Sequence, residues 1–200
     1  MQRGAKTLVH PLFAGLLLVL LAVPTPGSAG ETVESGVDPE LREKLQEAVE
    51  ESTSFADRFE AEVWLTDMST RLAPIIDDPG KRVRLLRKVH AEATRAGLEP
   101  ELVLAVIHVE SYFDRFAVSH AGARGLMQIM PFWLEEIGRP DDNLFDIQTN
   151  LRMGCTILRH YLDKEDGDLT RALARYHGSL GSRHYPSLVY TALSDYWYRG

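Results

Sequence analysis

The side chain with the clearest chemical potential is the carboxyl group of Glu110, which ends a mostly apolar stretch running from Glu101 to Tyr112. A glutamate in that position is exposed at the helix end, paired with another group, or held in a poorly hydrated cleft with its pKa raised. The third situation is the one that a general acid catalyst requires. Both the apolar stretch and the partial negative charge of a helix C-terminus would raise the pKa of Glu110.

Helical periodicity dominates the chain that has to position this carboxyl group. Apolar residues recur at helical spacing, and no stretch alternates apolar and polar residues as a strand would. No internal repeat is visible. The pattern predicts an all-α domain over residues 55–200, with helices packed around a central buried helix that ends in Glu110. The expected helices span residues 55–72, 81–96, 100–110, 132–137, 147–162, 169–177 and 185–198.

Two interruptions of the helical pattern carry expectations of their own. Residues 114–125 contain two glycines and no sustained period, so they predict an ordered loop, in which Asp114 has a structural role. Gly154 lies inside an expected helix, where glycine costs about 1 kcal/mol relative to alanine. We expect the close approach of another backbone to compensate for that cost.

The N-terminal part of the chain differs from the rest in composition. Residues 1–29 resemble a signal peptide, with basic residues near the start, an apolar core from Leu12 to Val23, and small residues up to Ala29. An uncleaved N-terminal anchor is the alternative. Residues 30–54 are acidic and sparsely apolar, which is typical of a loosely ordered segment or a peripheral helix. The chain is therefore expected to be exported.

The charge and cysteine content exclude some classes of function. The formal net charge of the chain is −7, and removal of the two basic residues in the signal segment makes it more negative. Nucleic-acid binding depends largely on Lys and Arg, so nucleic acid is not an expected partner. A single cysteine, Cys155, allows no internal disulfide, and we expect it to be buried.

Four motifs stand out by their residue types, order and separation. They are Glu110-Ser111, the Gly-Leu-Met-Gln sequence at 125–128, the segment 143–150, and the segment 174–181. Together they resemble the soluble type of lytic transglycosylase, within the goose-type lysozyme superfamily, over about residues 82–198. The resemblance implies a lysozyme-like transglycosylase domain.

The resemblance also implies a reaction, which is cleavage of the β-1,4 bond between N-acetylmuramic acid and N-acetylglucosamine in peptidoglycan. In that family one Glu acts twice, and Glu110 matches it: it protonates the glycosidic oxygen and then takes a proton from the C6 hydroxyl, which closes on C1. The product carries a 1,6-anhydromuramoyl end. Ordinary glycosidases need two carboxylates, and Asp114 is the nearest acidic residue after Glu110, but a role in structuring the loop is favoured for it.

The remaining site residues come from the same resemblance, each with a structural alternative. Ser111 would bond the glycan or steady the cleft, and Gln128 would bond sugar groups through its amide. Gly125 is a place for close approach of a sugar to the backbone. Met127 either touches an acetamido methyl group or packs in the core. Tyr176 matches a tyrosine whose hydroxyl the family places near the Glu, with a core aromatic residue as the alternative.

His177 departs from the family pattern, because most relatives carry Asn after that tyrosine. A neutral His can replace one hydrogen bond of Asn but has no amide carbonyl, and it becomes charged near pH 6.5. The exchange bears on rate and pH optimum more than on the fold. The residues Asn143, Asp146 and Asn150 match a family segment with turn and capping roles.

Peptidoglycan glycan strands are the expected partner, in the periplasm, with no stable membrane insertion after signal cleavage and no cofactor or metal. Two alternatives stay open: a lysozyme-like hydrolase in which water replaces the C6 hydroxyl, and a non-catalytic peptidoglycan-binding module. Aromatic residues could stack on sugar faces, although their helical spacing favours the core for most of them. These residues are Trp133, Tyr185, Tyr190, Tyr196 and Trp197.

Overall fold

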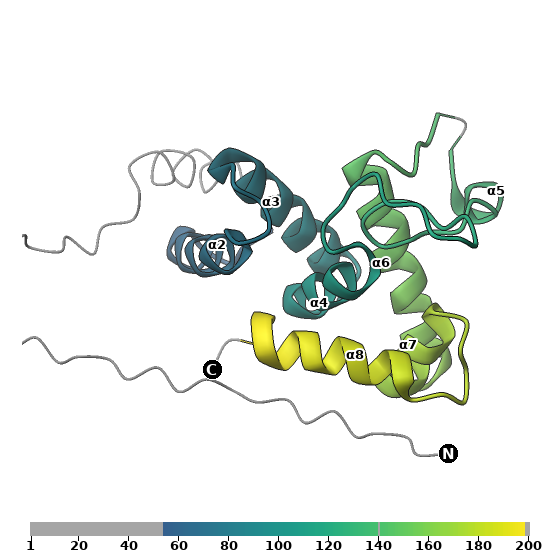
Figure 1. Ribbon diagram of the computed structural model, residues 1–200. Helices are drawn as coiled ribbons and strands as arrows, with labels where there is room; N and C mark the ends of the chain where they lie inside the picture. The colour runs from purple at the N-terminus through teal and green to yellow at the C-terminus, as the bar shows by residue number, and fades with distance from the viewer. Residues whose placement is uncertain (1–53, 140, 199–200) are drawn as a thin grey trace, which may run out of the picture. The chain divides into compact units, whose positions relative to one another are not determined.

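A computed structural model describes residues 54–139 and 141–198 of the chain (Figure 1). These residues form helices joined by turns and loops, and their β structure is limited to isolated bridges. The predicted all-α class is confirmed. The predicted signal segment 1–29 and all but the last residue of the segment 30–54 lie outside the described residues. None of the described helices is long and apolar enough to cross a membrane.

Four of the helices begin directly after an aspartate. Two of them start at the predicted residues 147 and 169, and the other two start at residues 58 and 79 instead of the predicted 55 and 81. In each case the Asp side chain accepts a hydrogen bond from the backbone N–H three residues later, over 2.7 to 3.0 Å. This bond satisfies one of the unpaired N–H groups of the first helical turn. The helices are α2 (Arg58–Leu72), α3 (Pro79–Arg95), α6 (Ile147–Lys164) and α7 (Leu169–Tyr176), capped by Asp57, Asp78, Asp146 and Asp168.

Helix α4 (Pro100–Ser111) is the central helix of the described domain. The side chains from Leu102 to Ile107 are buried, with at most 6% of each residue exposed. Figure 1 shows α4 between α3 above and α8 below, and both helices contact it. The prediction of a central buried helix that ends in Glu110 is therefore confirmed.

The C-terminal segment differs from the single helix predicted for residues 185–198. Helix α8 (His184–Ala192) is followed directly by a π-helical turn, η1 (Leu193–Trp197). Both contact α4. The π-helical turn buries Trp197 and leaves Tyr196 exposed. π-helical turns are rare, and apolar periodicity does not distinguish one from a continued α-helix.

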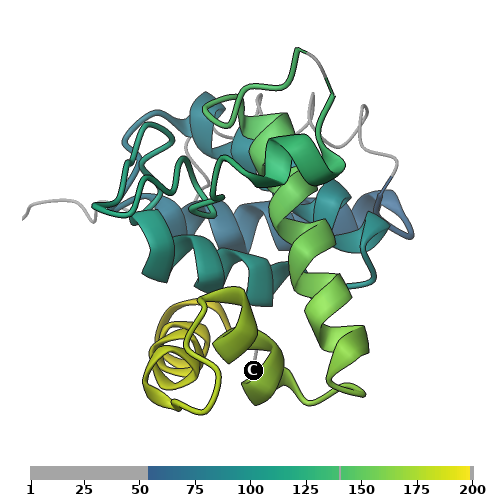
Figure 2. The same ribbon diagram turned by 90° about the vertical axis from the view of Figure 1, so that its right-hand side faces the viewer.

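Helix α6 carries a glycine where the loop after α4 packs against it. Figure 2 shows α6 running from the loop region to α7, and it contacts both α3 and α7. A Cβ atom added at Gly154 would lie 2.3 Å from the sulfur atom of Met127. The close approach predicted at this glycine therefore exists, but the prediction of a neighbouring backbone is wrong because a side chain fills the space.

This contact makes Gly154→Ala an informative substitution. Although alanine favours the helix, we expect the free energy of unfolding to fall by about 1–3 kcal/mol, because the methyl group would overpack against Met127. Urea unfolding measures the change. The double variant with Met127→Ala should show a coupling energy that partly rescues the single variant. Independent, additive effects would contradict the contact.

Candidate active site

The chain leaves α4 through a tight turn that starts the loop over the site. Tyr112 and Phe113 adopt left-handed conformations, with φ of 49° and 65°, and Phe113 turns into the core. Asp114 then accepts a hydrogen bond from the backbone N–H of Phe116 at 2.8 Å. This bond agrees with the structural role predicted for Asp114.

Asn150 holds the loop from the α6 side. Its Oδ1 accepts from the backbone N–H of Met127 at 2.8 Å, and its Nδ2 donates to the carbonyls of Arg124 and Leu144, each at 2.9 Å. Gly125 has a φ of 77°, and a Cβ there would lie 2.4 Å from Nδ2 of Asn150. The glycine therefore gives room to the Asn150 side chain, and its close approach to a sugar stays a prediction.

Ser111 fixes the other end of the same loop. Its hydroxyl donates to the Leu126 carbonyl at 2.8 Å and lies 3.2 Å from the Ile107 carbonyl of its own helix. Of the two roles considered for Ser111, this geometry supports the steadying of the cleft. The N-cap at Asp146 and the turn bond from Phe145 to Asn143 hold the segment before α6, as predicted.

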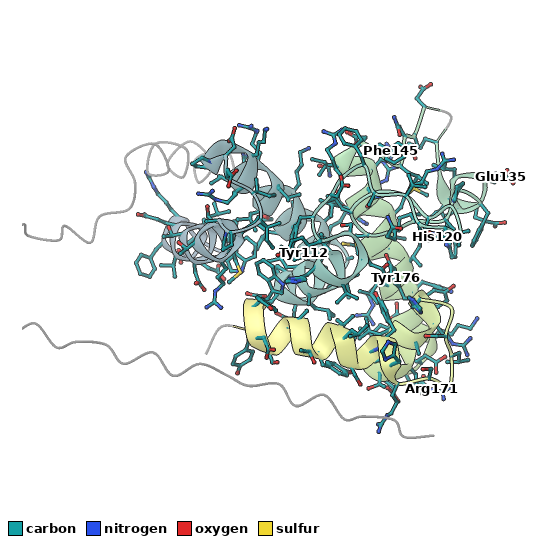
Figure 3. The ribbon with its side chains drawn as sticks, in the orientation of Figure 1. Tyr112, His120, Glu135, Phe145, Arg171 and Tyr176 are labelled. Carbon is teal, nitrogen blue, oxygen red and sulfur yellow. The ribbon has the colours of Figure 1, made fainter. Side chains whose placement is uncertain are left out.

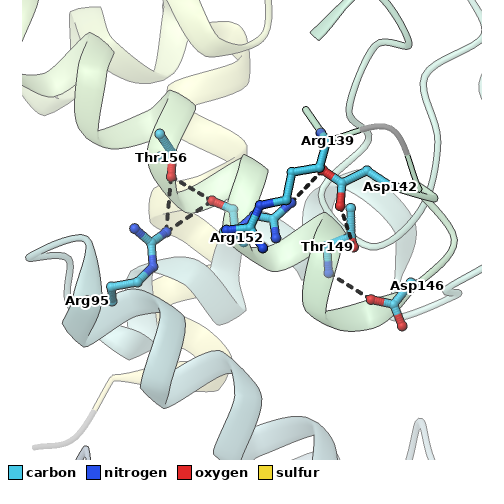
Figure 4. A network of polar contacts seen from close by, with 7 residues as sticks. All are labelled: Arg95, Arg139, Asp142, Asp146, Thr149, Arg152 and Thr156. Carbon is cyan, nitrogen blue, oxygen red and sulfur yellow. Dashed lines mark hydrogen bonds and ion pairs between the residues drawn. The ribbon is translucent and has the colours of Figure 1, made fainter. Parts of the chain in front are cut away.

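A polar network outside the site ties α6 to α3 and to the preceding loop (Figure 4). Arg152 binds Asp142 at 2.6 Å, and Asp142 also accepts from the Arg139 backbone at 2.8 Å. On the other side, Arg95 of α3 donates to the Arg152 carbonyl and to Thr156. The network fixes α6, which carries the Asn150 anchor.

A pocket of about 220 Å³ lies between this loop and the helices. Glu110 enters it from α4, and Tyr176 and His177 enter it from the end of α7. Glu110 is the only acidic residue among those that line this pocket. The lining residues of the described chain are Glu110, Ser119, Ala121, Ala123, Gln128, Ile129, Met130, Trp133, Ile157, Tyr176 and His177.

The carboxyl group of Glu110 is half-buried and has one hydrogen-bond donor. The hydroxyl of Tyr185 donates to its Oε1 at 2.6 Å. Burial raises the pKa of Glu110 to about 7, while the Tyr185 bond acts in the opposite direction. The neutral carboxyl group is thus favoured near neutral pH, in the direction predicted from the apolar stretch.

Tyr176 lines the pocket together with Glu110, as the resemblance implied, but its hydroxyl bonds a loop carbonyl instead of the carboxyl group. Its hydroxyl donates to the Met127 carbonyl at 2.7 Å, and Figure 3 shows it on the side of α7 towards the loop that carries His120. The hydroxyl that donates to Glu110 belongs to Tyr185. The sequence pattern favoured Tyr185 as a core residue. Tyr185 is indeed buried, and the signal for its second role is that buried tyrosine hydroxyls usually need a partner.

Gln128 and Met127 leave the loop in different directions. Gln128 lines the pocket, and its Nε2 donates to the carbonyls of Gly125 and Ala117 at 2.9 and 3.2 Å. Met127 is fully buried and its side chain packs on Gly154. The core alternative for Met127 is therefore the one that its position supports.

His177 is exposed at the rim of the pocket and stacks on Tyr185. The two ring centroids lie 4.3 Å apart, with an angle of 16° between the ring planes. The Nδ1 atom of His177 lies 3.2 Å from the Ser179 hydroxyl. Within the described ranges, no group of three or more His, Cys, Asp and Glu side chains is placed to hold a metal ion.

The comparison with protein families fits this arrangement of helices and motifs. The family model described as the transglycosylase SLT domain matches residues 88–188, just over half of the chain. The chain belongs to the transglycosylase SLT domain family, as the four motifs predicted.

Individual relatives are similar over part of their length. Membrane-bound lytic murein transglycosylase F of Desulfosudis oleivorans is 38% identical over 46% of this chain and 21% of its own length. A transglycosylase of Enterobacteria phage PRD1 is 34% identical over 48% of this chain and 36% of its own. Among solved structures, an inactive mutant of lytic transglycosylase Slt from Pseudomonas aeruginosa is similar, with 21% identity and a TM-score of 0.44. The match covers 80% of this chain and 34% of that chain. The chain spans less than two thirds of each of these relatives.

The Asn150 anchor generates a prediction on stability. Asn150→Ala would leave a buried N–H and two carbonyls without their partner, so we expect a loss of about 2–4 kcal/mol in the free energy of unfolding. Asn143→Ala is the matched control, because Asn143 is exposed and makes one turn bond. Chemical denaturation of both variants measures the difference. Equal effects would contradict the assigned role of Asn150.

The buried carboxyl group generates a prediction on the pH dependence of stability. The pKa of Glu110 is raised from 4.5 to about 7 in the folded chain. The contribution of its protonation to stability is therefore present in full below about pH 4.5 and is lost as pH rises through 7. The free energy of unfolding of Glu110→Gln, relative to that of the wild type, should therefore rise by about 2–3 kcal/mol between about pH 4 and about pH 8. Thermal unfolding across this range tests it, with the exposed Glu135→Gln as control. A difference independent of pH would refute it.

Proposed function

We propose that this chain is a peptidoglycan lytic transglycosylase that cleaves the β-1,4 bond between N-acetylmuramic acid and N-acetylglucosamine. The observation that carries the proposal is the half-buried carboxyl group of Glu110, whose pKa is raised to about 7 in the pocket. A neutral carboxyl group at the end of an apolar helix is suited to general acid catalysis near neutral pH. Membership in the SLT domain family supports the choice of substrate.

Glu110 performs two proton transfers in this proposal. It first donates its proton to the glycosidic oxygen as the bond from that oxygen to C1 breaks. The Tyr185 hydroxyl stabilises the resulting carboxylate through its bond to Oε1. The carboxylate then takes the proton of the C6 hydroxyl while the C6 oxygen bonds to C1. Glu110 ends protonated, the sugar carries a 1,6-anhydro ring, and no water is consumed.

The composition of the pocket supports a reaction with one carboxylate. A glycosidase with two carboxylates places them on either side of the scissile bond, and the lining residues include no second acid. The substrate supplies its own nucleophile instead. Gln128 lines the same pocket with its Nε2 engaged by loop carbonyls, so its Oε1 is the atom proposed to accept a bond from a sugar hydroxyl.

The proposal includes export of the chain and action in the periplasm, where peptidoglycan is accessible. The signal-like segment 1–29 supports export. The relative from Desulfosudis oleivorans is named a membrane-bound murein transglycosylase. For this chain we propose a protein that is released from the membrane after removal of the signal segment.

Mass spectrometry of muropeptides released from purified sacculi tests the function. The wild type should release products with anhydro ends, one water lighter than reducing ends, and Glu110→Gln should lower the rate by at least about 100-fold. Glu135→Gln, on the exposed side of the short helix α5 (Trp133–Ile137), is the control for the loss of a carboxylate elsewhere (Figure 3).

Each alternative outcome has a distinct meaning. Products with reducing ends would replace the proposal by a hydrolase. Binding to sacculi without release of glycan would identify a non-catalytic binding module. Activity that survives Glu110→Gln would remove Glu110 from the mechanism.

A further inference from the structure

We infer that His177 is a positioning residue, which holds the ring of Tyr185 so that its hydroxyl stays on the carboxyl group of Glu110. The inference rests on the proposed function, since it assigns His177 a part in preparing that carboxyl group. It differs from the contact with substrate expected from the sequence.

The rings of His177 and Tyr185 stack on each other. The imidazole of His177 lies nearly parallel to the phenol of Tyr185, with ring centroids 4.3 Å apart and an angle of 16°. A flat group against one face of the phenol prevents the ring from swinging in that direction. The hydroxyl at the far end of the ring would move most in such a swing. That hydroxyl is the group 2.6 Å from Oε1 of Glu110.

His177 is itself held in place. It directly follows the last residue of α7, and its Nδ1 lies 3.2 Å from the Ser179 hydroxyl. The backbone N–H of Ser179 donates to the Ala174 carbonyl at 2.7 Å. The end of α7 therefore fixes the imidazole, and the imidazole covers Tyr185 of α8.

An imidazole ring and an amide differ in how much of the Tyr185 ring they can cover. An Asn side chain can hydrogen-bond through its amide, but it is smaller than an imidazole ring and covers less of a phenol face. Aromatic pairs contribute about 0.5–1.5 kcal/mol beyond the area that they bury. His177 is exposed, and the face of its ring packs against Tyr185.

The groups that face Glu110 define what a substitution of His177 would change. They are the hydroxyl of Tyr185, which donates to it, Tyr176 of α7, and the uncharged amide of Gln128. His177 is the one residue lining this pocket that can take a positive charge. A test therefore has to separate the shape of the His177 ring from its charge.

Titration of the Glu110 carboxyl carbon by carbon-13 NMR makes this separation. The Tyr185 bond lowers the pKa of Glu110, so its weakening in His177→Ala should raise the midpoint by about 0.5–1 unit. His177→Phe keeps a flat ring without a charge and should leave the midpoint near that of the wild type. Tyr185→Phe removes the bond to Glu110 and should give the largest rise in the titration midpoint. His177→Asn replaces the ring by an amide and should behave like His177→Ala.

The outcomes separate this inference from the proposed function. An unchanged midpoint in His177→Ala would overturn the positioning role, and so would a shift in His177→Phe equal to that in His177→Ala. The titration needs no substrate, so it decides the question even if the chain releases no glycan. With active protein, His177→Ala should lower kcat several-fold with little change in KM, and His177→Phe should restore kcat.

Discussion

The structure depends on the burial of one carboxyl group at the end of the central helix. Glu110 is carried into the domain by an apolar helix that packs against α3, α8 and the π-helical turn. Among the described residues, the Tyr185 hydroxyl is its hydrogen-bond donor, at 2.6 Å. Removing a carboxylate from water with one donor is costly, so the neutral form is favoured up to about pH 7. The surrounding chain has to maintain that environment.

Side chains from the neighbouring helices hold the loop over the pocket through hydrogen bonds to the loop backbone. Several motif residues make these bonds. Ser111, Asn150 and Tyr176 each bond a backbone group of residues 126 or 127. Gly125 gives space to one of these anchors. These side chains therefore shape the pocket wall, and Gln128 of the same loop lines the pocket itself. Contact of any of them with a sugar stays a prediction.

The elements that the sequence predicts well are those that depend on local interactions. Helical periodicity locates most helices, because an apolar face repeats within a few residues along the chain. The misses depend on contacts between distant residues. Tyr185 reaches Glu110 from 75 residues away, and Met127 fills the space beside Gly154 on another helix. No local pattern distinguishes such a tyrosine from a core residue, or marks the stack of His177 on it.

The account rests on a Glu110 carboxyl group that is protonated near neutral pH. Infrared difference spectroscopy between the wild type and Glu110→Gln, recorded at about pH 6, observes that group directly, since a neutral carboxyl group and a carboxylate absorb at different frequencies. The account predicts a protonated carboxyl band in the wild type that converts to carboxylate as pH rises through about 7. A band already in the carboxylate form at about pH 6 would contradict it.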